Sequence, residues 1–309
     1  MIQAAVAQTV WRGATEYPAT AMPGEGLTTF ARLLEERSSG TVRLRPAFDG
    51  PDGLRSATIP MAVQVGRLEV GDAFAGSLSA IDPIFQLSSL PFLATNENEA
   101  WRLYKAAKGA YQRVFAARGQ RLMYATPWPA SGIWSREPLD SPERLQGLAV
   151  RTYDPTSTAV MRGAGAAAVE LSFADAMPRL RDGSIVAVLS SGDGGAGRKL
   201  WEYTRHFTAI GYAMPLSFTT LSEVAYQALT PAMRRIVDDA GADTEWVQWG
   251  VMLLRREQNY ATMRTNGVVI AEASPALAAA LATAATTVTQ DWLRQAGPDA
   301  AAILNAFRP

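Results

Sequence analysis

The chain of 309 residues contains no cysteine and a single histidine, His206. Without cysteine it can form no disulfide, no thiol nucleophile and no cysteine-ligated metal centre. With one imidazole, a histidine-based catalytic pair or transition-metal site is a poor hypothesis, so we expect neither a metal nor a cofactor. The absence of cysteine is compatible with either side of a membrane and does not locate the protein.

An excess of charge and long apolar runs are also missing. The 29 basic residues balance the 29 acidic ones, which argues against the basic face that a nucleic-acid partner requires. The sequence contains no run of about 18 apolar residues, so it predicts no membrane-spanning helix. With 48% hydrophobic and 19% charged residues, the composition is typical of a globular protein long enough for two domains.

Strand patterns alternate with helix patterns along the chain, which predicts an α/β fold with largely parallel sheets. We expect strands at residues 10–15, 41–48, 73–75, 120–128 and 207–217. We expect helices at residues 24–39, 59–65, 97–118, 230–239 and 245–264, and a helical C-terminus after residue 275.

Residues 138–191 hold the pattern on which the functional interpretation depends. One short strand ends at Arg151, a second ends just before Phe173, and a third ends at Ser190 and Ser191. In an open α/β sheet, ligands bind beyond the carboxyl ends of the strands. An arginine suits a carboxylate there because its planar fork forms two parallel hydrogen bonds, and hydroxyl groups can add donors.

These segments resemble the solute-binding proteins of tripartite ATP-independent periplasmic (TRAP) transporters, the DctP family. The resemblance is carried by residues 141–151 (SPERLQGLAVR), 66–71 (GRLEVG) and 90–93 (LPFL). Residues 14–18 (ATEYP) and the segment 30–42 match the family's beginning. The matching segments follow the family's order, so the resemblance covers almost the whole chain.

The resemblance implies a two-lobed periplasmic-binding-protein clamp (type II-like), with mixed, mostly parallel sheets joined by hinge strands and a long helix. Lobe I would comprise residues 1–127 and 215–250. Lobe II would comprise residues 128–214 and 251–309, with C-terminal helices packing across both lobes. The protein would be a periplasmic monomer that captures a small organic carboxylate, catalyses no reaction and delivers its ligand to TRAP membrane permease subunits.

The first residues are consistent with export. Ala5, Val6 and Ala7 before Gln8 resemble the small-residue end of a secretory signal peptide. A plain alanine-rich leader is the simpler alternative, and we favour the signal peptide because the family is exported.

The resemblance also assigns ligand-binding roles. Arg151 matches the arginine that grips the carboxylate, and Phe173 matches an aromatic residue that packs on the ligand. Ser190 stands where the family usually has asparagine. The other expected ligand contacts are Glu16, Tyr17, Phe74, Trp128, Trp134, Tyr153, Ser191, Asp193 and Tyr212.

Each of these residues also has a structural interpretation. Arg151 could pair with a nearby acid, and a lone aromatic such as Phe173 is more often part of a core. Ser190 and Ser191 could cap the turn that follows them, and Asp193 lies between glycines, as turn residues often do.

Counting charges favours a monocarboxylate ligand, because the matched positions supply one arginine and the acid Glu16. Family members that bind sialic acid carry a further arginine near this region, whereas this chain has Ser131. The aromatic candidates suggest an aromatic, heteroaromatic or 2-oxo acid. Two other functions stay open from the sequence: an α/β enzyme acting on a carboxylic acid with Asp193 or Glu16 as general base, and a ligand-binding sensor domain.

Overall fold

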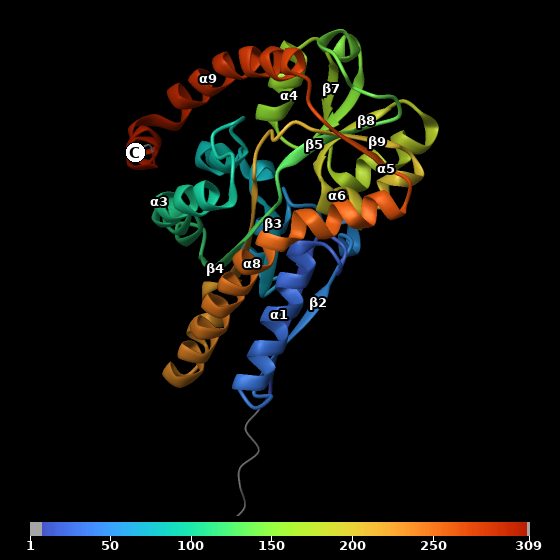
Figure 1. The fold of residues 1–309 in the computed structure, drawn as a ribbon. Helices are drawn as coiled ribbons and strands as arrows, with labels where there is room; N and C mark the ends of the chain where they lie inside the picture. The colour runs from blue at the N-terminus through green and yellow to red at the C-terminus, as the bar shows by residue number, and fades with distance from the viewer. Residues whose placement is uncertain (1–7, 308–309) are drawn as a thin grey trace, which may run out of the picture. The chain divides into compact units, whose positions relative to one another are not determined.

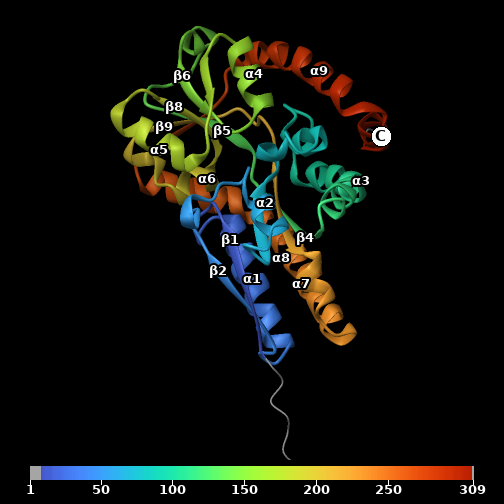
Figure 2. The same cartoon turned by 180° about the vertical axis from the view of Figure 1, so that it is seen from behind.

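The computed structural model describes residues 8–307, which form two compact units (Figures 1 and 2). Unit 1 contains the chain up to Ala73, Gln112–Thr126 and Ser217–Gly250. Unit 2 contains Phe74–Tyr111, Pro127–Leu216 and the chain from Val251 onward. The segment 5–7, interpreted as the end of a signal peptide, lies outside the described residues. Within residues 8–307, no helix combines the length and apolar character that crossing a membrane requires.

The sheet of unit 1 has five strands in the order β2-β1-β3-β10-β4. Strand β1 pairs in parallel with both β2 and β3. The strands are β1 (Thr9–Thr15), β2 (Val42–Ala47), β3 (Val70–Phe74), β4 (Gln120–Pro127) and β10 (Leu216–Ser222). The accompanying helices are α1 (Met22–Arg37), α2 (Ile59–Gln64) and α7 (Glu223–Gln227), together with the first part of α8 (Pro231–Thr265).

Helix α1 shows how the sequence pattern builds this unit. Leu27, Phe30 and Leu34 recur at helical spacing and are fully buried, so they form the apolar stripe of an amphipathic helix. The Phe30 ring meets Tyr124 of β4 edge to face, with 5.6 Å between ring centroids. Burying such a side chain contributes about 1.5–3 kcal/mol, so this stripe fixes the helix on the sheet.

The sheet of unit 2 has six strands in the order β11-β9-β5-β8-β6-β7. Strand β5 runs antiparallel to β8 and β9, whereas β6 is parallel to β7 and β8, and β11 is parallel to β9. The strands are β5 (Ser131–Ser135), β6 (Ala149–Thr152), β7 (Ala167–Glu170), β8 (Ala187–Ser191), β9 (His206–Ala209) and β11 (Val269–Glu272). The prediction of mixed α/β sheets with a long helix is therefore confirmed.

Helices cover this sheet and extend from it. They are α4 (Pro155–Gly163), α5 (Phe173–Asp182), α6 (Gly192–Gly197) and α9 (Pro275–Phe307), together with most of α3 (Glu97–Ala116) and the end of α8. Figures 1 and 2 both show α4 beside α9. Gly163 permits this approach, because a Cβ atom there would lie 3.2 Å from the Cβ of Ala284.

Segment 74–111 groups with unit 2, whereas the predicted lobe I included it. Long-range bonds explain the grouping. The Phe92 N–H donates to the Tyr212 carbonyl at 2.7 Å, and the indole N–H of Trp292 on α9 donates to the Pro83 carbonyl at 2.7 Å. Helix α9 lies entirely in unit 2. The partition into functional lobes stays a prediction.

Two boundaries predicted from the sequence were wrong. The expected strand 207–217 is two strands, β9 and β10, because Gly211 adopts a positive φ of 57° and Pro215 cannot donate to a ladder. The expected helices 230–239 and 245–264 are one helix, α8, of 35 residues. Strand β11 was not predicted.

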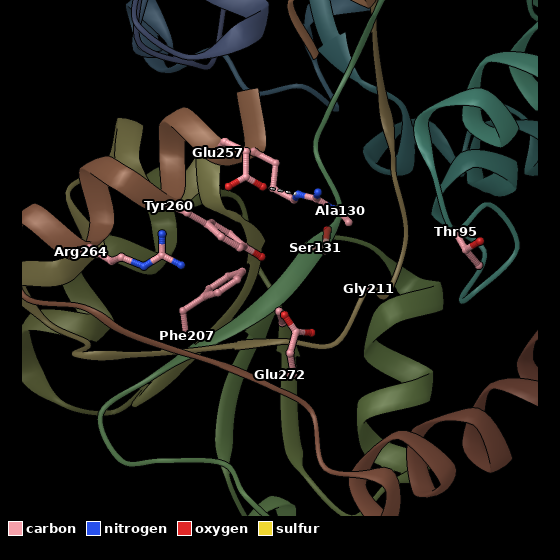
Figure 3. A pocket seen from close by; sticks show the side chains of 11 residues that line it. Thr95, Ala130, Ser131, Phe207, Gly211, Glu257, Tyr260, Arg264 and Glu272 are labelled. Atoms are coloured by element: carbon pink, nitrogen blue, oxygen red, sulfur yellow. Dashed lines mark hydrogen bonds and ion pairs between the residues drawn. The ribbon is translucent and has the colours of Figure 1, made fainter. Parts of the chain in front are cut away.

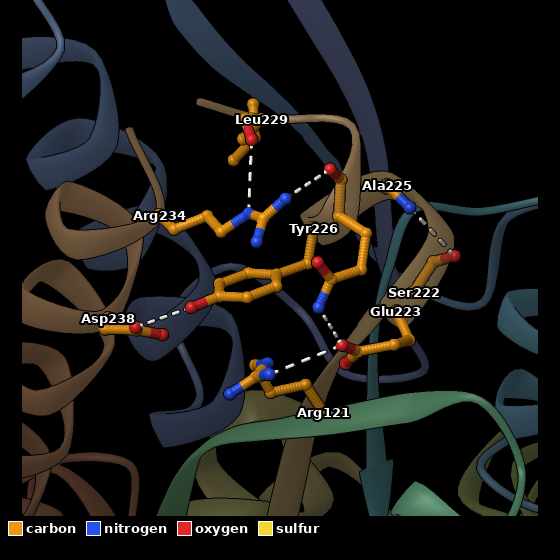
Figure 4. A network of polar contacts seen from close by, with 9 residues as sticks. Arg121, Ser222, Glu223, Ala225, Tyr226, Leu229, Arg234 and Asp238 are labelled. Carbon is orange, nitrogen blue, oxygen red and sulfur yellow. Dashed lines mark hydrogen bonds and ion pairs between the residues drawn. The ribbon is translucent and has the colours of Figure 1, made fainter. Parts of the chain in front are cut away.

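Tyr226 is held between two arginines in unit 1 (Figure 4). The guanidinium carbon of Arg121 lies 3.9 Å from the ring centroid, and that of Arg234 lies 5.6 Å away. The Tyr226 hydroxyl donates to the Asp238 carboxylate at 2.6 Å. Burial and the neighbouring Asp238 carboxylate raise the pKa of Tyr226, so the phenol keeps its proton and remains a donor.

We expect Tyr226→Phe to lower the free energy of unfolding by about 1–2 kcal/mol, because it removes a hydrogen bond to a charged acceptor. Tyr226→Ala should cost about 3–5 kcal/mol, because the packing and the cation–π contacts are lost as well. Urea denaturation followed by circular dichroism measures both. Tyr203→Phe, which removes an exposed hydroxyl that accepts from Arg181, is the control and should change stability by less than about 0.5 kcal/mol. Equal stability of Tyr226→Phe and wild type would contradict this account.

Candidate functional site

Arg151 lies in β6, and its side chain is buried. Its Nε donates to the Leu171 carbonyl at 2.8 Å, and its Nη1 donates to the Leu189 carbonyl at 3.4 Å. Its guanidinium carbon lies 4.4 Å from the centroid of the Phe173 ring. Two backbone bonds and one aromatic face thus fix the guanidinium at the carboxyl ends of β6 and β7, next to β8.

Phe173 and Ser190 are brought to the same place. Helix α5 begins at Phe173, directly after Ser172, whose side chain caps it. A Cβ atom on Gly194 would lie 2.5 Å from Ser190 Oγ and 3.3 Å from the Phe173 ring. The predicted association of Arg151, Phe173 and Ser190 is therefore present in the fold, and their contact with a ligand stays a prediction.

Three other predicted residues have structural partners in this region. Ser191 Oγ accepts from the Gly194 N–H at 3.1 Å and so caps α6. The Asp193 carboxylate is buried, 2.5 Å from Nε of Arg255. The indole N–H of Trp134 donates to the Ser191 carbonyl at 3.2 Å. These contacts account for all three residues structurally, so their ligand contacts stay predictions.

Several of the predicted aromatic residues also lie together in unit 2. The Tyr153 ring meets Phe74 edge to face at 5.2 Å between centroids and Tyr212 at 6.4 Å. The Tyr153 hydroxyl donates to Ser131 Oγ at 3.3 Å. All three rings are buried, as is Trp128. The structure therefore brings Phe74, Tyr153 and Tyr212 together.

Glu16 and Tyr17 belong to unit 1. Glu16 is buried, and its Oε2 accepts from the Ser56 N–H at 2.8 Å, so it is not a solvated turn residue. The Tyr17 ring is buried as well, and its carbonyl accepts from the Asp49 N–H. Their predicted role in ligand binding stays a prediction.

Two acids that were not predicted as site residues, Asp154 and Glu170, interact electrostatically with Arg151. Burial raises the pKa of Asp154, while the bonds from Ser157 and the charge of Arg151 lower it only in part. The pKa of Glu170 is also raised, by burial and by the Asp154 charge, against an opposing effect of Arg151. Two carboxyl groups therefore interact with Arg151, and their raised pKa values reflect burial that Arg151 offsets only in part.

An open pocket of about 400 Å³ lies elsewhere on unit 2 (Figure 3). Its wall contains the rings of Tyr260 and Phe207, which meet edge to face with 5.8 Å between centroids. Side chains of both charges, such as Arg264 and Glu272, also line it. Ser131, the partner of Tyr153, also lines it, but the predicted ligand residues do not. The exposed charges make it a poor match for the buried carboxylate site that the sequence predicts.

Comparisons of the sequence and of the structure with known proteins both find solute-binding proteins. The chain matches the DctP family model, bacterial extracellular solute-binding protein family 7, over residues 13–295. It is similar to DctP7, a Bordetella pertussis extracytoplasmic solute receptor binding pyroglutamic acid, with TM-score 0.94 and 26% identity over 97% of this chain and 100% of that chain. A marine metagenome TRAP solute-binding protein specific for pyroglutamate gives TM-score 0.92 and 25% identity over 98% and 99% of the two chains. A solute-binding protein of Verminephrobacter eiseniae is 22% identical over 247 residues, which are 76% of this chain and 71% of the relative.

Proposed function

Because this chain belongs to the DctP family of bacterial extracellular solute-binding proteins, we propose that it captures a small monocarboxylate and delivers it to the membrane subunits of a TRAP transporter. Like the family, it is a periplasmic solute receptor and not an enzyme. The observation that carries the proposal is the buried Arg151 guanidinium, fixed over Phe173 at the ends of the strands.

The geometry of Arg151 suits carboxylate recognition. Its backbone bonds to Leu171 and Leu189 hold the planar group in one orientation before a ligand arrives, so little side-chain entropy is lost on binding. A charge-assisted bond in a buried site is stronger than one in water, because the surroundings screen it less. Phe173, beneath the guanidinium, offers a ring against which the ligand body can pack.

The surrounding acids support a ligand with one carboxylate. Asp154 and Glu170 are the acids that interact electrostatically with Arg151, so a second ligand carboxylate beside them would meet acidic groups rather than a second cation. A buried charge without a partner costs several kcal/mol. The predicted ligand contacts Phe74, Tyr153 and Phe173 are buried apolar rings, which favour a compact, mainly apolar ligand over a sugar acid, whose many hydroxyl groups need partners.

Relatives that bind pyroglutamate support the same class, whereas structures at 15–18% identity hold succinate or sugar acids. Pyroglutamate, which two of the similar structures bind, has one carboxylate on a small ring. We therefore place compact cyclic monocarboxylates first among candidate ligands, with 2-oxo and aromatic acids next.

A thermal-shift screen of carboxylic acids, followed by calorimetry, tests the proposal. Pyroglutamate or another compact monocarboxylate should raise the melting temperature by several degrees, since a ligand at 100 times its Kd adds about 2.7 kcal/mol of stability. Succinate and glucuronate should bind at least about tenfold more weakly than the best monocarboxylate. The proposal would be overturned if succinate or glucuronate bound more tightly than every monocarboxylate tested.

A further inference from the structure

Only one of the two oxygens of the Asp154 carboxyl group is hydrogen-bonded to a described residue. One oxygen, Oδ1, accepts from the Ser157 N–H at 2.7 Å and from the Ser157 hydroxyl at 2.6 Å, and so caps α4. The other oxygen, Oδ2, is buried and makes no hydrogen bond with any described residue. Buried carboxylate oxygens are normally satisfied, so an unbonded one requires an explanation.

Two buried hydroxyl groups of unit 2 share this property. Neither Ser89 Oγ nor Tyr212 Oη has a hydrogen-bond partner among the described residues, and both side chains are fully buried. Both lie near Asp154. The Ser89 hydroxyl interacts with the Asp154 carboxyl group and helps to lower its pKa, although the two do not reach hydrogen-bond geometry, and the Asp154 charge helps to raise the pKa of Tyr212. One acceptor and two potential donors therefore gather in one buried place.

The backbone at Gly76 packs closely against the Asp154 carboxyl group. A Cβ atom on Gly76 would lie 2.5 Å from Asp154 Oδ2 and 2.7 Å from the Phe74 ring, so a side chain there would press on the oxygen. Asp154, Ser89 and Tyr212 lie next to the aromatic rings described above, because the Tyr153 ring contacts both Phe74 and Tyr212. Asp154 follows Arg151 by three residues, and the charge of Arg151 acts on it.

We infer that Asp154 Oδ2 accepts a hydrogen bond from an N–H group of the ligand whose carboxylate Arg151 holds, while Ser89 and Tyr212 donate to the adjacent carbonyl. This inference rests on the proposed function and narrows it to carboxylates that carry a lactam or similar amide. An N–H beside a C=O is the group that one carboxylate oxygen and two hydroxyls complement. Leaving these atoms unpaired in a buried site is costly, so a ligand that satisfies them is selected over one that does not.

The decisive experiment compares pyroglutamate with 5-oxotetrahydrofuran-2-carboxylate, the lactone in which a ring oxygen replaces the N–H. Calorimetry on the wild-type protein should give about 10- to 100-fold tighter binding of the lactam, the range expected when a buried acceptor is left without its donor. Because this comparison needs no variant, it does not depend on how a substitution affects folding.

Asp154→Asn tests the residue itself. Asparagine can still cap α4 through its oxygen, but it then presents an NH₂ group where Oδ2 was. The preference for the lactam should fall to about threefold or less, mainly through weaker lactam binding. Asp82→Asn is the matched control, because Asp82 also caps a helical turn in unit 2, accepting from the Ile84 N–H at 2.9 Å. It should keep the full preference.

The outcomes separate this inference from the proposed function. Equal binding of lactam and lactone by the wild type would overturn it, because the three polar atoms would then be satisfied by water or by one another. A full lactam preference in Asp154→Asn would overturn it too. If neither compound binds but another monocarboxylate does, the lactam class is wrong and the carboxylate receptor stands. If no carboxylate binds, the proposed function fails as well.

Discussion

Replacing Arg151 with alanine is expected to reduce the affinity for pyroglutamate by at least about 30-fold. Removing one partner of a buried, charge-assisted pair costs about 2–5 kcal/mol, which corresponds to that factor or more. Arg151→Lys should lie between alanine and wild type, because an ammonium group keeps the charge but lacks the planar fork. Calorimetry with pyroglutamate measures each affinity.

Loss of binding must be separated from loss of structure, because Arg151 also donates to the carbonyls of Leu171 and Leu189. Arg162→Ala is the matched control. The Arg162 Nε donates to the Ala168 carbonyl at 3.0 Å in the same unit, so this variant loses the same kind of backbone bond. Arg162→Ala should bind like the wild type, and melting curves should show Arg151→Ala folded. A folded Arg151→Ala protein with wild-type affinity would exclude Arg151 as the carboxylate-binding residue.

Asp72 in unit 1 is expected to make stability depend on pH. It is fully buried, with Thr15 Oγ1 donating to its Oδ1 at 2.9 Å and Thr219 Oγ1 donating to its Oδ2 at 3.0 Å. Burial raises its pKa from 3.8 to about 7, so the folded state holds a proton that the unfolded state releases. Stability from this group is fully present below pH 3.8 and is lost as pH rises to about 7, above which the loss is constant.

Asp72→Asn should remove this dependence, because an amide does not titrate and the two hydroxyl groups can rotate to serve it. Between pH 5 and pH 8, the unfolding free energy of the variant relative to wild type should rise by about 2–3 kcal/mol, from a pKa shift of about three units. Urea titrations at both pH values measure the difference. Asp52→Asn changes an exposed aspartate that pairs with Arg67. The unfolding free energy of this control relative to wild type should be the same at pH 5 and pH 8. A constant stability gap between Asp72→Asn and wild type would show that Asp72 stays ionised in the fold.

Regular elements could be predicted from the sequence where periodicity is strong. The stripe Leu27, Phe30 and Leu34 predicts α1, and residues 97–118 predict α3 to within two residues at its end. Periodicity failed where tertiary contacts decide. Strand β11 has only four residues, is mostly exposed, and is defined by its parallel pairing with β9.

The candidate site shows the same limit. Arg151, Phe173 and Ser190 could be selected because each follows or ends a predicted strand, and the fold brings them together. Asp154 was not selected, because an aspartate before proline is the ordinary start of a helix, and it does cap α4. What distinguishes it is an unbonded oxygen near Ser89, and that proximity depends on packing between segments far apart in the sequence.

The glycines of helix α6 restrict how this receptor can change its ligand. A Cβ atom on Gly195 would come within 2.2 Å of the Trp134 ring, and one on Gly194 would meet Ser190. Mutant libraries that randomise these two positions should therefore yield mostly misfolded proteins rather than new specificities. Laboratory evolution would do better to vary the aromatic positions 74, 153 and 212, where a smaller side chain leaves the backbone of α6 in place and enlarges the space for a ligand.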